Sequence, residues 1–391
     1  MRIVDILRDG NSELRIEFIT DVERLESLAA PWEALTSREI DRDPAFFQSF
    51  AWSMHVARLR SARSASSYRV CVVKVLRGER LVGLWPLSLQ RQSSVWLLRN
   101  LDDPFGQFAG AVFEDSSDIT PSIVAIVQAL RRERMADGMQ IEGVIADSPL
   151  HRGLTAAGLR ISASNEAVIV DLRPFPSFPD YTRTINAKTR KNLRNLFNRL
   201  NRAGPTTVVV ATEPECIRKV IESSFTDRVQ WLNDHGKTST AFRNADFRPL
   251  VAALPDSDGI GLRAFTLLHD GNVIAQQWGF IHGDRYYAYI SSRDPAFDAF
   301  SAGRIHLGHV IQSCYEDGLR ILELMPPKVD YKMTWTDSTR RLDSFIAAFT
   351  VRGRLVLRLW LTHLEPALRR VSHSFPPRIR RKLAALVNAA G

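Results

Sequence analysis

The most informative pattern in the chain is an order of apolar and polar segments that occurs twice. In the first copy, alternating apolar positions predict three successive strands joined by short turns, the first of them at Gly78-Glu79. An apolar stripe at helical spacing follows, and Gly138 ends it before a short apolar run. The first copy therefore predicts strands over 68–76, 81–90, 95–101 and 140–145 and a helix over 123–135.

The second copy repeats the order with stronger turn signals. His269-Asp270-Gly271-Asn272 is typical of a tight hairpin, and Gly318 ends the following helix. The predicted strands are 262–268, 273–281, 285–292 and 319–324, with a helix over about 302–317. Both copies form an antiparallel meander followed by a helix and a strand, which predicts an α+β fold used twice.

A proline-rich segment separates the two copies. Residues 173–179 contain three prolines, which cannot continue a helix or a central strand. Helical segments (21–35 and 48–59) precede the first meander, and a basic helix, a strand at 206–211 and further helical segments precede the second. The predicted domains are 1–172, without an obvious donor site, 173–350, which is catalytic, and 351–391, a basic amphipathic helical tail.

Composition indicates an ordinary globular protein. The chain has 391 residues and is 45% hydrophobic. Cys71, Cys216 and Cys314 are too few for a disulfide framework, which favours a reducing compartment. Residues 1–11 lack the apolar core of a signal peptide, and no apolar run approaches the roughly 20 residues that span a bilayer. We expect a cytoplasmic protein, with peripheral contact at the inner membrane face left open by the tail.

The net charge of +9 is concentrated in two segments. Residues 351–391 contain nine basic residues and one acid, and residues 180–204 contain seven and one. In the second segment Leu193, Leu196, Phe197 and Leu200 form a buried helical stripe, with basic residues mostly away from it. The basic side chains form either a solvated face or an anion-binding wall; in the second case Lys191 and Arg194 are candidate substrate-binding residues.

The start of the second-copy helix is a candidate phosphate site. Ser301 suits an N-cap, Gly303 allows close approach to the backbone, and Arg304 adds a cation. Free amides and the helix dipole favour a phosphate at such a position. The first-copy helix begins Thr120-Pro121-Ser122, without glycine or arginine. We therefore predict a phosphorylated ligand in the second copy only.

The segment from Leu319 to Trp335 carries further candidate chemistry. A buried strand has Glu323 near its end, and Asp330, Tyr331 and Lys332 follow a proline pair. Polar groups at strand ends often line sites in folds of this kind. The alternative is that Tyr331 and Trp335 are packing residues and that Lys332 is solvated.

Taken together, these motifs resemble those of the GNAT-like acyltransferases. The resemblance rests on the order of motifs over residues 14–350, and its closest branch is the CelD-like family, associated with cellulose biosynthesis and related to the FemAB peptidyl transferases. Its elements are Phe47-Gln48-Ser49 with Trp52, Gly83-Leu84-Trp85-Pro86-Leu87, the helix from Lys188, Tyr286-Tyr287 with Tyr289, Asp294-Pro295, Ser301-Ala302-Gly303-Arg304, and Asp330, Lys332 and Trp335. Family members often have proline at the position of Ala302. The resemblance implies two tandem GNAT-like domains and acyl transfer from acyl-CoA, with acetyl-CoA the expected co-substrate.

The resemblance also implies roles for individual residues. Backbone amides at Trp278 and Gly279 would polarise the thioester carbonyl, and Ser301, Gly303 and Arg304 would hold the donor. Glu323 or Asp330 would act as general base, and Tyr289 or Tyr331 would protonate the leaving thiolate. Gln277, Lys332, Lys191 and Arg194 would contact the substrates. The expected acceptor is an amine or hydroxyl, anionic or part of a saccharide, in envelope polysaccharide or cell-surface biosynthesis.

Two other functions stay open on the sequence. One is aminoacyl transfer from an aminoacyl-tRNA, the only case in which we expect a nucleic-acid partner; the other is a non-catalytic GNAT-fold binding module. His306 and His309 could share a helix face, but no carboxylate or cysteine nearby completes a metal site, so no metal is expected. The tail is either a membrane-surface anchor or a helix packed on the fold, and packing is slightly favoured.

Overall fold

The computed structural model describes residues 2–9, 12–39, 45–92 and 94–359, which form two compact units. The first unit comprises the described residues up to Ser164 together with 243–250 and 341–359. The second comprises Asn165–Phe242 and Val251–Arg340. The domain limits predicted from the sequence stay a prediction.

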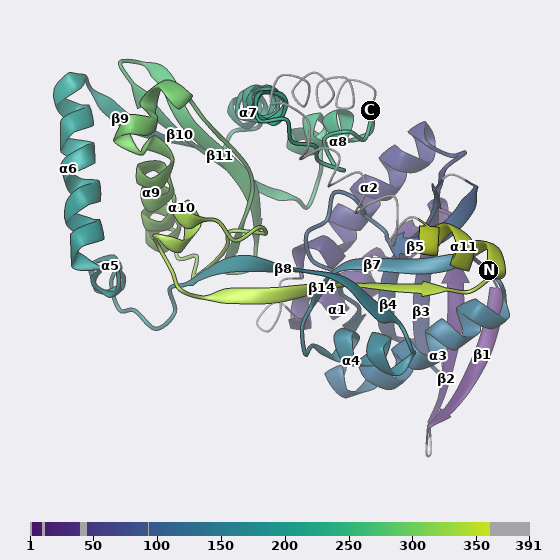
Figure 1. The fold of residues 1–391 in the computed structure, drawn as a ribbon. Helices are drawn as coiled ribbons and strands as arrows, with labels where there is room; N and C mark the ends of the chain where they lie inside the picture. The colour runs from purple at the N-terminus through teal and green to yellow at the C-terminus, as the bar shows by residue number, and fades with distance from the viewer. Residues whose placement is uncertain (1, 10–11, 40–44, 93, 360–391) are drawn as a thin grey trace. The chain divides into compact units, whose positions relative to one another are not determined.

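The first unit is built on one sheet with helices against it (Figure 1). Neighbouring strands run antiparallel except β5 and β7, which are parallel and are connected through the helix α3. The strands in spatial order are β1 (Arg2–Asp9), β2 (Ser12–Ile19), β3 (Tyr68–Arg77), β4 (Arg80–Gln92), β5 (Val95–Asn100), β7 (Gly138–Ile145) and β14 (Thr339–Ala348), with β6 (Val112–Phe113) beside β4. The helices are α1 (Ala29–Glu39), α2 (Phe50–Arg63), α3 (Ile119–Arg132), α4 (Pro149–Ala156) and α11 (Val351–Leu359).

The second unit repeats this plan. Its strands are antiparallel except β12 and β13, which are parallel and are connected through α9. In spatial order they are β8 (Arg160–Asp171), β13 (Ile321–Glu323), β12 (Arg285–Arg293), β11 (Asn272–His282), β10 (Gly261–His269) and β9 (Thr206–Ala211). The helices are α5 (Phe178–Thr184), α6 (Ala187–Ala203), α7 (Pro214–Asp234), α9 (Ala302–Glu316) and α10 (Asp330–Met333), and α8 (Phe247–Ala252) begins in one unit and ends in the other.

Each sheet is completed by a strand from beyond its own meander. β14 follows the second meander in sequence but pairs with β7 of the first sheet. β8 follows the first meander, and its residues Ile169 to Asp171 pair with β13 of the second sheet. Each repeat therefore contributes one strand to the sheet of the other.

Two helices cover opposite faces of the second sheet. α7 and α9 both contact β10, β11 and β12 (Figure 1). On the α9 side, the helix buries one apolar stripe in a cluster with sheet residues: Leu307, Val310, Ile311 and Cys314, with Phe265, Tyr286 and Leu322. On the α7 side, Trp278 is fully buried and its Nε1 donates to Ser224 Oγ at 3.1 Å. The alternation along β11 explains the division, because successive side chains of a strand point to opposite faces.

Most predicted elements of the two meanders are confirmed within a few residues. The first-copy helix begins at Ile119 rather than residue 123, because Pro121 lies in its first turn, where the missing N–H needs no intrahelical partner. The final strand is shorter than predicted and covers only Ile321–Glu323. The strands β1, β2, β8 and β14 were not predicted from the sequence.

The C-terminal segment begins as a packed helix. In α11, Leu357 is buried against Val95 and Leu97 of β5, while Val351 and Leu355 are exposed. The remainder of the predicted tail, residues 360–391, lies outside the described residues. No helix in the described ranges is long and apolar enough to cross a membrane.

A buried carboxyl group in the first unit gives a testable dependence of stability on pH. Asp102 is almost fully buried and accepts a hydrogen bond from Trp52 Nε1 at 2.7 Å. Burial raises its pKa from 3.8 to about 7, against the opposing effect of the Trp52 donor. A carboxyl with a raised folded-state pKa contributes full stability below the unfolded pKa and loses it as pH rises through the folded pKa.

We expect Asp102→Asn to flatten the dependence of unfolding free energy on pH between about 4 and 7. In the unsubstituted protein this group removes up to about 1.4 kcal/mol of stability per pH unit over that range. Urea unfolding at pH 5 and pH 7.5 measures the difference, and Asp258→Asn, at an exposed carboxylate, is the control. Parallel pH profiles for the unsubstituted protein and Asp102→Asn would contradict this assignment.

Candidate active site

The start of α9 presents backbone donors to a ligand. Ser301 precedes the helix with φ 54° and ψ 43°, a left-handed conformation that is uncommon for serine. Its carbonyl accepts hydrogen bonds from the amides of Arg304 and Ile305 at 2.9 and 3.1 Å. Ser301 occupies the predicted N-cap position, but its side chain makes no capping hydrogen bond. Within the described ranges, the amides of Ala302 and Gly303 have no acceptor, so the first turn keeps two donors for an anion.

Arginine side chains surround this helix start. Gly303 lies against Arg293, because a Cβ built on it would be 3.3 Å from Arg293 Cδ. Arg293 forms a two-point ion pair with Asp298, with N–O distances of 2.7 and 3.0 Å. Arg304 is half-buried and has no acid partner in the part of the chain that the structure describes. The helix start therefore combines free amides with an unneutralised guanidinium.

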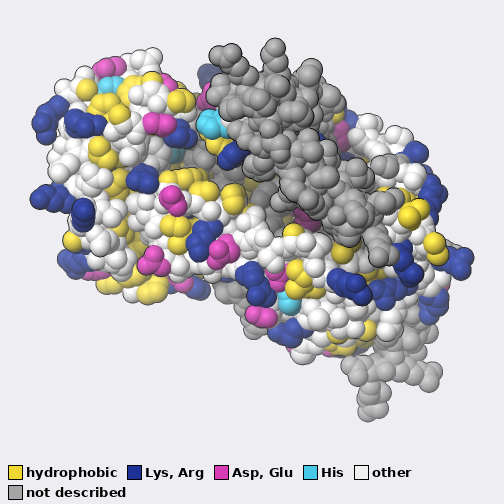
Figure 2. Space-filling view, viewed as in Figure 1, with side chains coloured by type: hydrophobic (Ala, Val, Ile, Leu, Met, Phe, Trp, Pro, Cys, Tyr) yellow, Lys and Arg dark blue, Asp and Glu magenta, His cyan; other side chains and the backbone are white. Residues whose placement is uncertain are grey.

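The basic helix α6 packs beside the same turn. Its apolar stripe contacts the cluster that contains Ala302 and Ile305 of α9. Arg199 donates to the carbonyl of Ala299 at 2.8 Å and stacks on Phe300, directly before the start of α9. Lys191 and Arg194 are exposed, and Figure 2 shows basic side chains gathered on the side of the second unit that α6 forms. This placement favours the anion-binding interpretation of the helix.

The strands β12 and β13 separate next to this site. They pair only from Arg285–Ile321 to Tyr287–Glu323, after which β13 ends and β12 continues to Arg293. A bulge inserts Tyr289 into β12 opposite Trp278 and Gly279. Beyond Tyr287, no strand in the described ranges pairs with that side of β12. Its backbone groups there are available to an extended ligand.

The position of β11 corrects the predicted role of the Trp278 and Gly279 backbone amides. Trp278 and Gly279 lie in a strand that is paired on both sides, with β10 and with β12. Gly279 is required by packing, since a Cβ there would lie 1.9 Å from the carbonyl oxygen of Tyr287. Backbone amides that polarise a donor carbonyl are therefore better assigned to β12, which has the free side.

Gln277 is a buried polar residue on the α9 face. It pairs across the sheet with Ser291, and its Oε1 atom is buried without a hydrogen-bond partner among the described residues. Tyr331 makes a hydrogen bond with the same Ser291. An unsatisfied buried acceptor costs roughly 1–3 kcal/mol, so its retention favours a ligand contact.

Tyr331 is the better placed of the two candidate tyrosines. Burial raises the pKa of its hydroxyl, and the hydrogen bond with Ser291 acts in the opposite direction. Tyr289 lies on the other face, with its ring 5.3 Å from Trp278 and 4.9 Å from Phe280. The structure therefore brings Tyr331 together with Gln277 and Ser291, and it places Tyr289 beside the α7 face.

The two candidate bases have different surroundings. Glu323 is fully buried and forms ion pairs with Arg285 at 3.0 Å and Arg340 at 3.5 Å. Its carboxylate is therefore engaged by two guanidinium groups inside the fold. Asp330 is exposed at the first residue of α10. Of the two carboxylates, only that of Asp330 is exposed to solvent.

Lys332 holds the chain where it leaves β13. Its Nζ donates to the carbonyls of Met325 at 2.7 Å and Pro327 at 3.0 Å. Burial lowers its pKa from 10.5 to about 7, with a smaller contribution from Arg228. Its contacts are intramolecular, so its predicted contact with the acceptor or donor stays a prediction.

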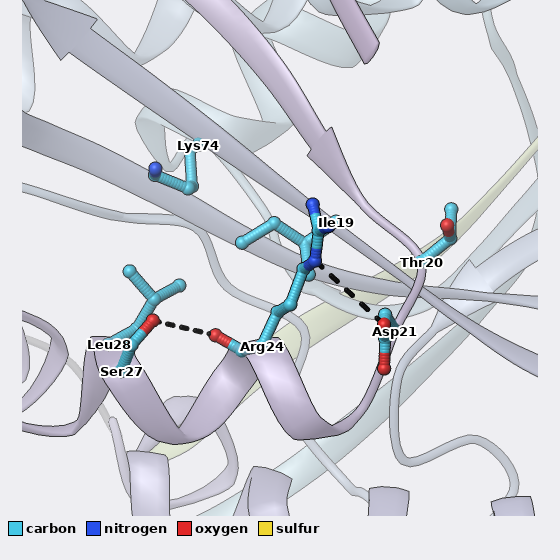
Figure 3. Close-up of a pocket in the computed structure, with 7 residues that line it drawn as sticks. All are labelled: Ile19, Thr20, Asp21, Arg24, Ser27, Leu28 and Lys74. Carbon is cyan, nitrogen blue, oxygen red and sulfur yellow. Dashed lines mark hydrogen bonds and ion pairs between the residues drawn. The ribbon is translucent and has the colours of Figure 1, made fainter. Parts of the chain in front are cut away.

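The first unit differs at the corresponding helix. α3 follows Asp118, which pairs with Arg77 at 2.9 Å, and Pro121 removes one amide from its first turn. An acid and a missing donor make this start unsuitable for a phosphate. A cavity of about 260 Å³ in this unit is lined by other residues, among them Asp21, Arg24 and Lys74 (Figure 3). It contains none of the candidate site residues.

Comparisons with known proteins identify the fold of the chain. Residues 187–333 match the family described as Acetyltransferase (GNAT) domain. The crystal structure of FemX is similar with a TM-score of 0.57 and 10% identity, over 88% of this chain and 100% of that chain. The chain has the GNAT fold. The predicted α+β class and GNAT-like fold are confirmed, and the structure divides into two compact units of the same plan.

Two further solved structures are similar. The C-terminal domain (DUF2156) of a putative lysylphosphatidylglycerol synthetase from Agrobacterium fabrum has a TM-score of 0.52 and 15% identity, over 86% of this chain and 96% of that one. A tandem GNAT protein from the clavulanic acid biosynthesis pathway has a TM-score of 0.48 and 12% identity, over 85% and 99%. No curated protein sequence matches. The GNAT fold rests on the family match and on the two structures with TM-scores above 0.5, while membership of the CelD-like branch stays a prediction.

Sequence reasoning missed several residues of this site. Ser291, Arg293 and Arg228 were not identified, although Arg293 directly precedes the Asp294-Pro295 pair that was. Their association depends on the pairing of β11 with β12 and on the packing of α7. Only the tyrosine-rich strand before them gave a local signal.

Proposed function

We propose that this chain transfers an acyl group, in the first instance acetyl, from acyl-CoA to an amine or hydroxyl acceptor. The observation that carries the proposal is the start of α9, where two free amides and Arg304 lie beside the unpaired side of β12. Diphosphate suits the amides and the guanidinium, and the amide-rich arm of coenzyme A suits an exposed strand edge. The CelD-like resemblance adds envelope polysaccharide or cell-surface biosynthesis as the proposed setting.

The proposed transfer is a direct displacement. The acceptor nitrogen or oxygen attacks the thioester carbon, the new bond forms, and the carbon–sulfur bond breaks after a tetrahedral oxyanion. Backbone amides of β12 would stabilise that oxyanion. Asp330 would take the acceptor proton, with Glu323 as the less favoured base, and Tyr331 would supply a hydrogen bond or proton to the departing thiolate.

We expect Arg304→Ala to weaken acyl-CoA binding about 10- to 100-fold. The basis is the loss of one charge-assisted hydrogen bond to phosphate, worth about 1.5–3 kcal/mol. Calorimetric titration with acetyl-CoA measures the change. Arg160→Ala, at an exposed arginine of the first unit, is the matched control and should bind like the unsubstituted protein. Equal affinities for all three proteins would remove Arg304 from the donor site.

Aminoacyl transfer from an aminoacyl-tRNA is a second candidate, favoured by α6. Lys188, Lys191, Arg194 and Arg202 are exposed on this helix, and none has an acid partner among the described residues. A phosphate backbone bound there would give an affinity that falls steeply with salt. Salt-dependent tRNA binding without measurable acetyl-CoA binding would favour this candidate, and binding of neither would favour a non-catalytic module.

A further inference from the structure

A polar network fixes helix α7 on the sheet next to the candidate site. Asp227 Oδ2 accepts hydrogen bonds from Ser292 Oγ at 2.8 Å and from Gln276 Nε2 at 3.1 Å. One turn earlier, Ser224 accepts from Trp278 Nε1 and Ser223 donates to Gln276 Oε1 at 2.9 Å. These contacts place the residue after Asp227 beside the end of β12.

That residue is Arg228. Its guanidinium lies over the ring of Trp231 at 4.4 Å, and the side chain is partly buried. Stacking on an aromatic face restrains a guanidinium and leaves its N–H edge free for hydrogen bonds. In the portion of the chain that the structure describes, no carboxylate forms an ion pair with Arg228. Burial lowers its pKa, Tyr331 raises it and Arg293 lowers it, which places all three residues within electrostatic range.

The two cations near Arg228 already have partners within the protein, whereas Arg228 has no carboxylate partner among the described residues. Arg293 is neutralised by Asp298, and the Lys332 ammonium donates to two carbonyls. A partly desolvated cation without a counter-ion is costly unless a ligand supplies one. Arg228 belongs to α7, which covers one face of the sheet, and α9 covers the other. The donor phosphates are proposed to lie at the start of α9.

We propose that Arg228 binds an anionic group, a carboxylate or a phosphate, carried by the acceptor. This inference rests on the proposed acyl transfer and specifies its acceptor class. The planar guanidinium suits two-point recognition of either anion. The acceptor is then a small amine or alcohol with an acidic group, held on the α7 side while the donor occupies the α9 side.

Phosphate titration of the acetyl-CoA-saturated full-length protein tests the inference without knowledge of the acceptor. With the α9 site filled by the donor, inorganic phosphate should still bind, and Arg228→Gln should weaken that binding at least tenfold. Arg218→Gln is the control, because Arg218 lies on the same helix but pairs with Asp256 at 2.8 Å. Absence of phosphate binding, or equal binding by Arg228→Gln, would overturn the proposal.

Matched acceptor pairs provide the second measurement. Glucosamine 6-phosphate is compared with glucosamine, and β-alanine with 3-aminopropanamide, by release of coenzyme A thiol. The anionic member of an accepted pair should have at least tenfold higher kcat/KM, through KM, and Arg228→Gln should remove the preference. A preference for the neutral members, or equal loss for both, would contradict the role. If acetyl-CoA does not bind, the proposed acyl transfer is wrong. Phosphate titration of the unsubstituted protein and Arg228→Gln without the donor then still decides whether Arg228 binds anions.

Discussion

Gly303→Asp is expected to abolish measurable acyl-CoA binding while leaving the fold intact. Gly303 is in the first turn of α9, where its amide has no acceptor among the described residues. An aspartate there would place a negative charge against the donor phosphates, and like charges in contact cost several kcal/mol. Affinity should therefore fall about 100-fold or more. Titration calorimetry with acetyl-CoA measures it.

The same substitution should not destabilise the helix. An acidic residue in a first turn interacts favourably with the helix dipole, by about 0.3–1 kcal/mol. The new Cβ would meet Arg293 Cδ at 3.3 Å, and that side chain is flexible. Gly303→Ala, which adds the Cβ without the charge, separates the steric from the electrostatic effect and should lose much less affinity. Strong binding by Gly303→Asp would place the donor phosphates elsewhere.

Glu323→Gln is expected to lower the free energy of unfolding by about 3–5 kcal/mol. Glu323 is fully buried, and Arg285, its closest ion-pair partner, is only 2% exposed. Neutralising the carboxylate breaks a buried ion pair by removing one of its two charged members, which carries a cost of that size. Chemical unfolding followed by tryptophan fluorescence measures the change.

Two further variants determine whether the ion pair is the cause. Glu323→Leu combined with Arg285→Met should be more stable than either single substitution, because an apolar pair leaves no buried charge. Glu166→Gln, at an exposed ion pair with Lys328, should cost no more than about 1 kcal/mol. A mild effect of Glu323→Gln on stability with a large loss of transfer would instead support Glu323 as the base.

The meanders were predictable because their signals are local. Alternating apolar residues and the Asp270-Gly271 turn define β10 and β11 without reference to the rest of the chain. The exchanged strands β8 and β14 were not predictable, because their pairing partners lie far away in the sequence. Residues 160–165 of β8 are all exposed, so half of that strand has no apolar alternation to detect. Only Leu342, Asp343 and Phe345 of β14 are buried, and the strand pairs with β7, about 200 positions earlier in the sequence.

The candidate site likewise contains residues that are predictable from local sequence and residues that only the fold brings together. The start of α9 was predictable because Ser301, Gly303 and Arg304 are adjacent in sequence and suit a phosphate together. The pairing of Glu323 with Arg285 was not, since the parallel pairing of β12 with β13 brings together residues 38 positions apart. Arg228 reaches the site through the packing of α7, for which the sequence contains no local signal.

Amide hydrogen exchange at the start of α9 shows whether the donor binds there. Acetyl-CoA bound through the amides of Ala302 and Gly303 should slow exchange of deuterium in a peptide covering residues 295–305, and in one covering 288–293 of β12. A peptide covering the first turn of α3, which lacks the free amides and the arginine, should be unchanged. Protection at α3 with none at α9, on saturation with acetyl-CoA, would contradict the account.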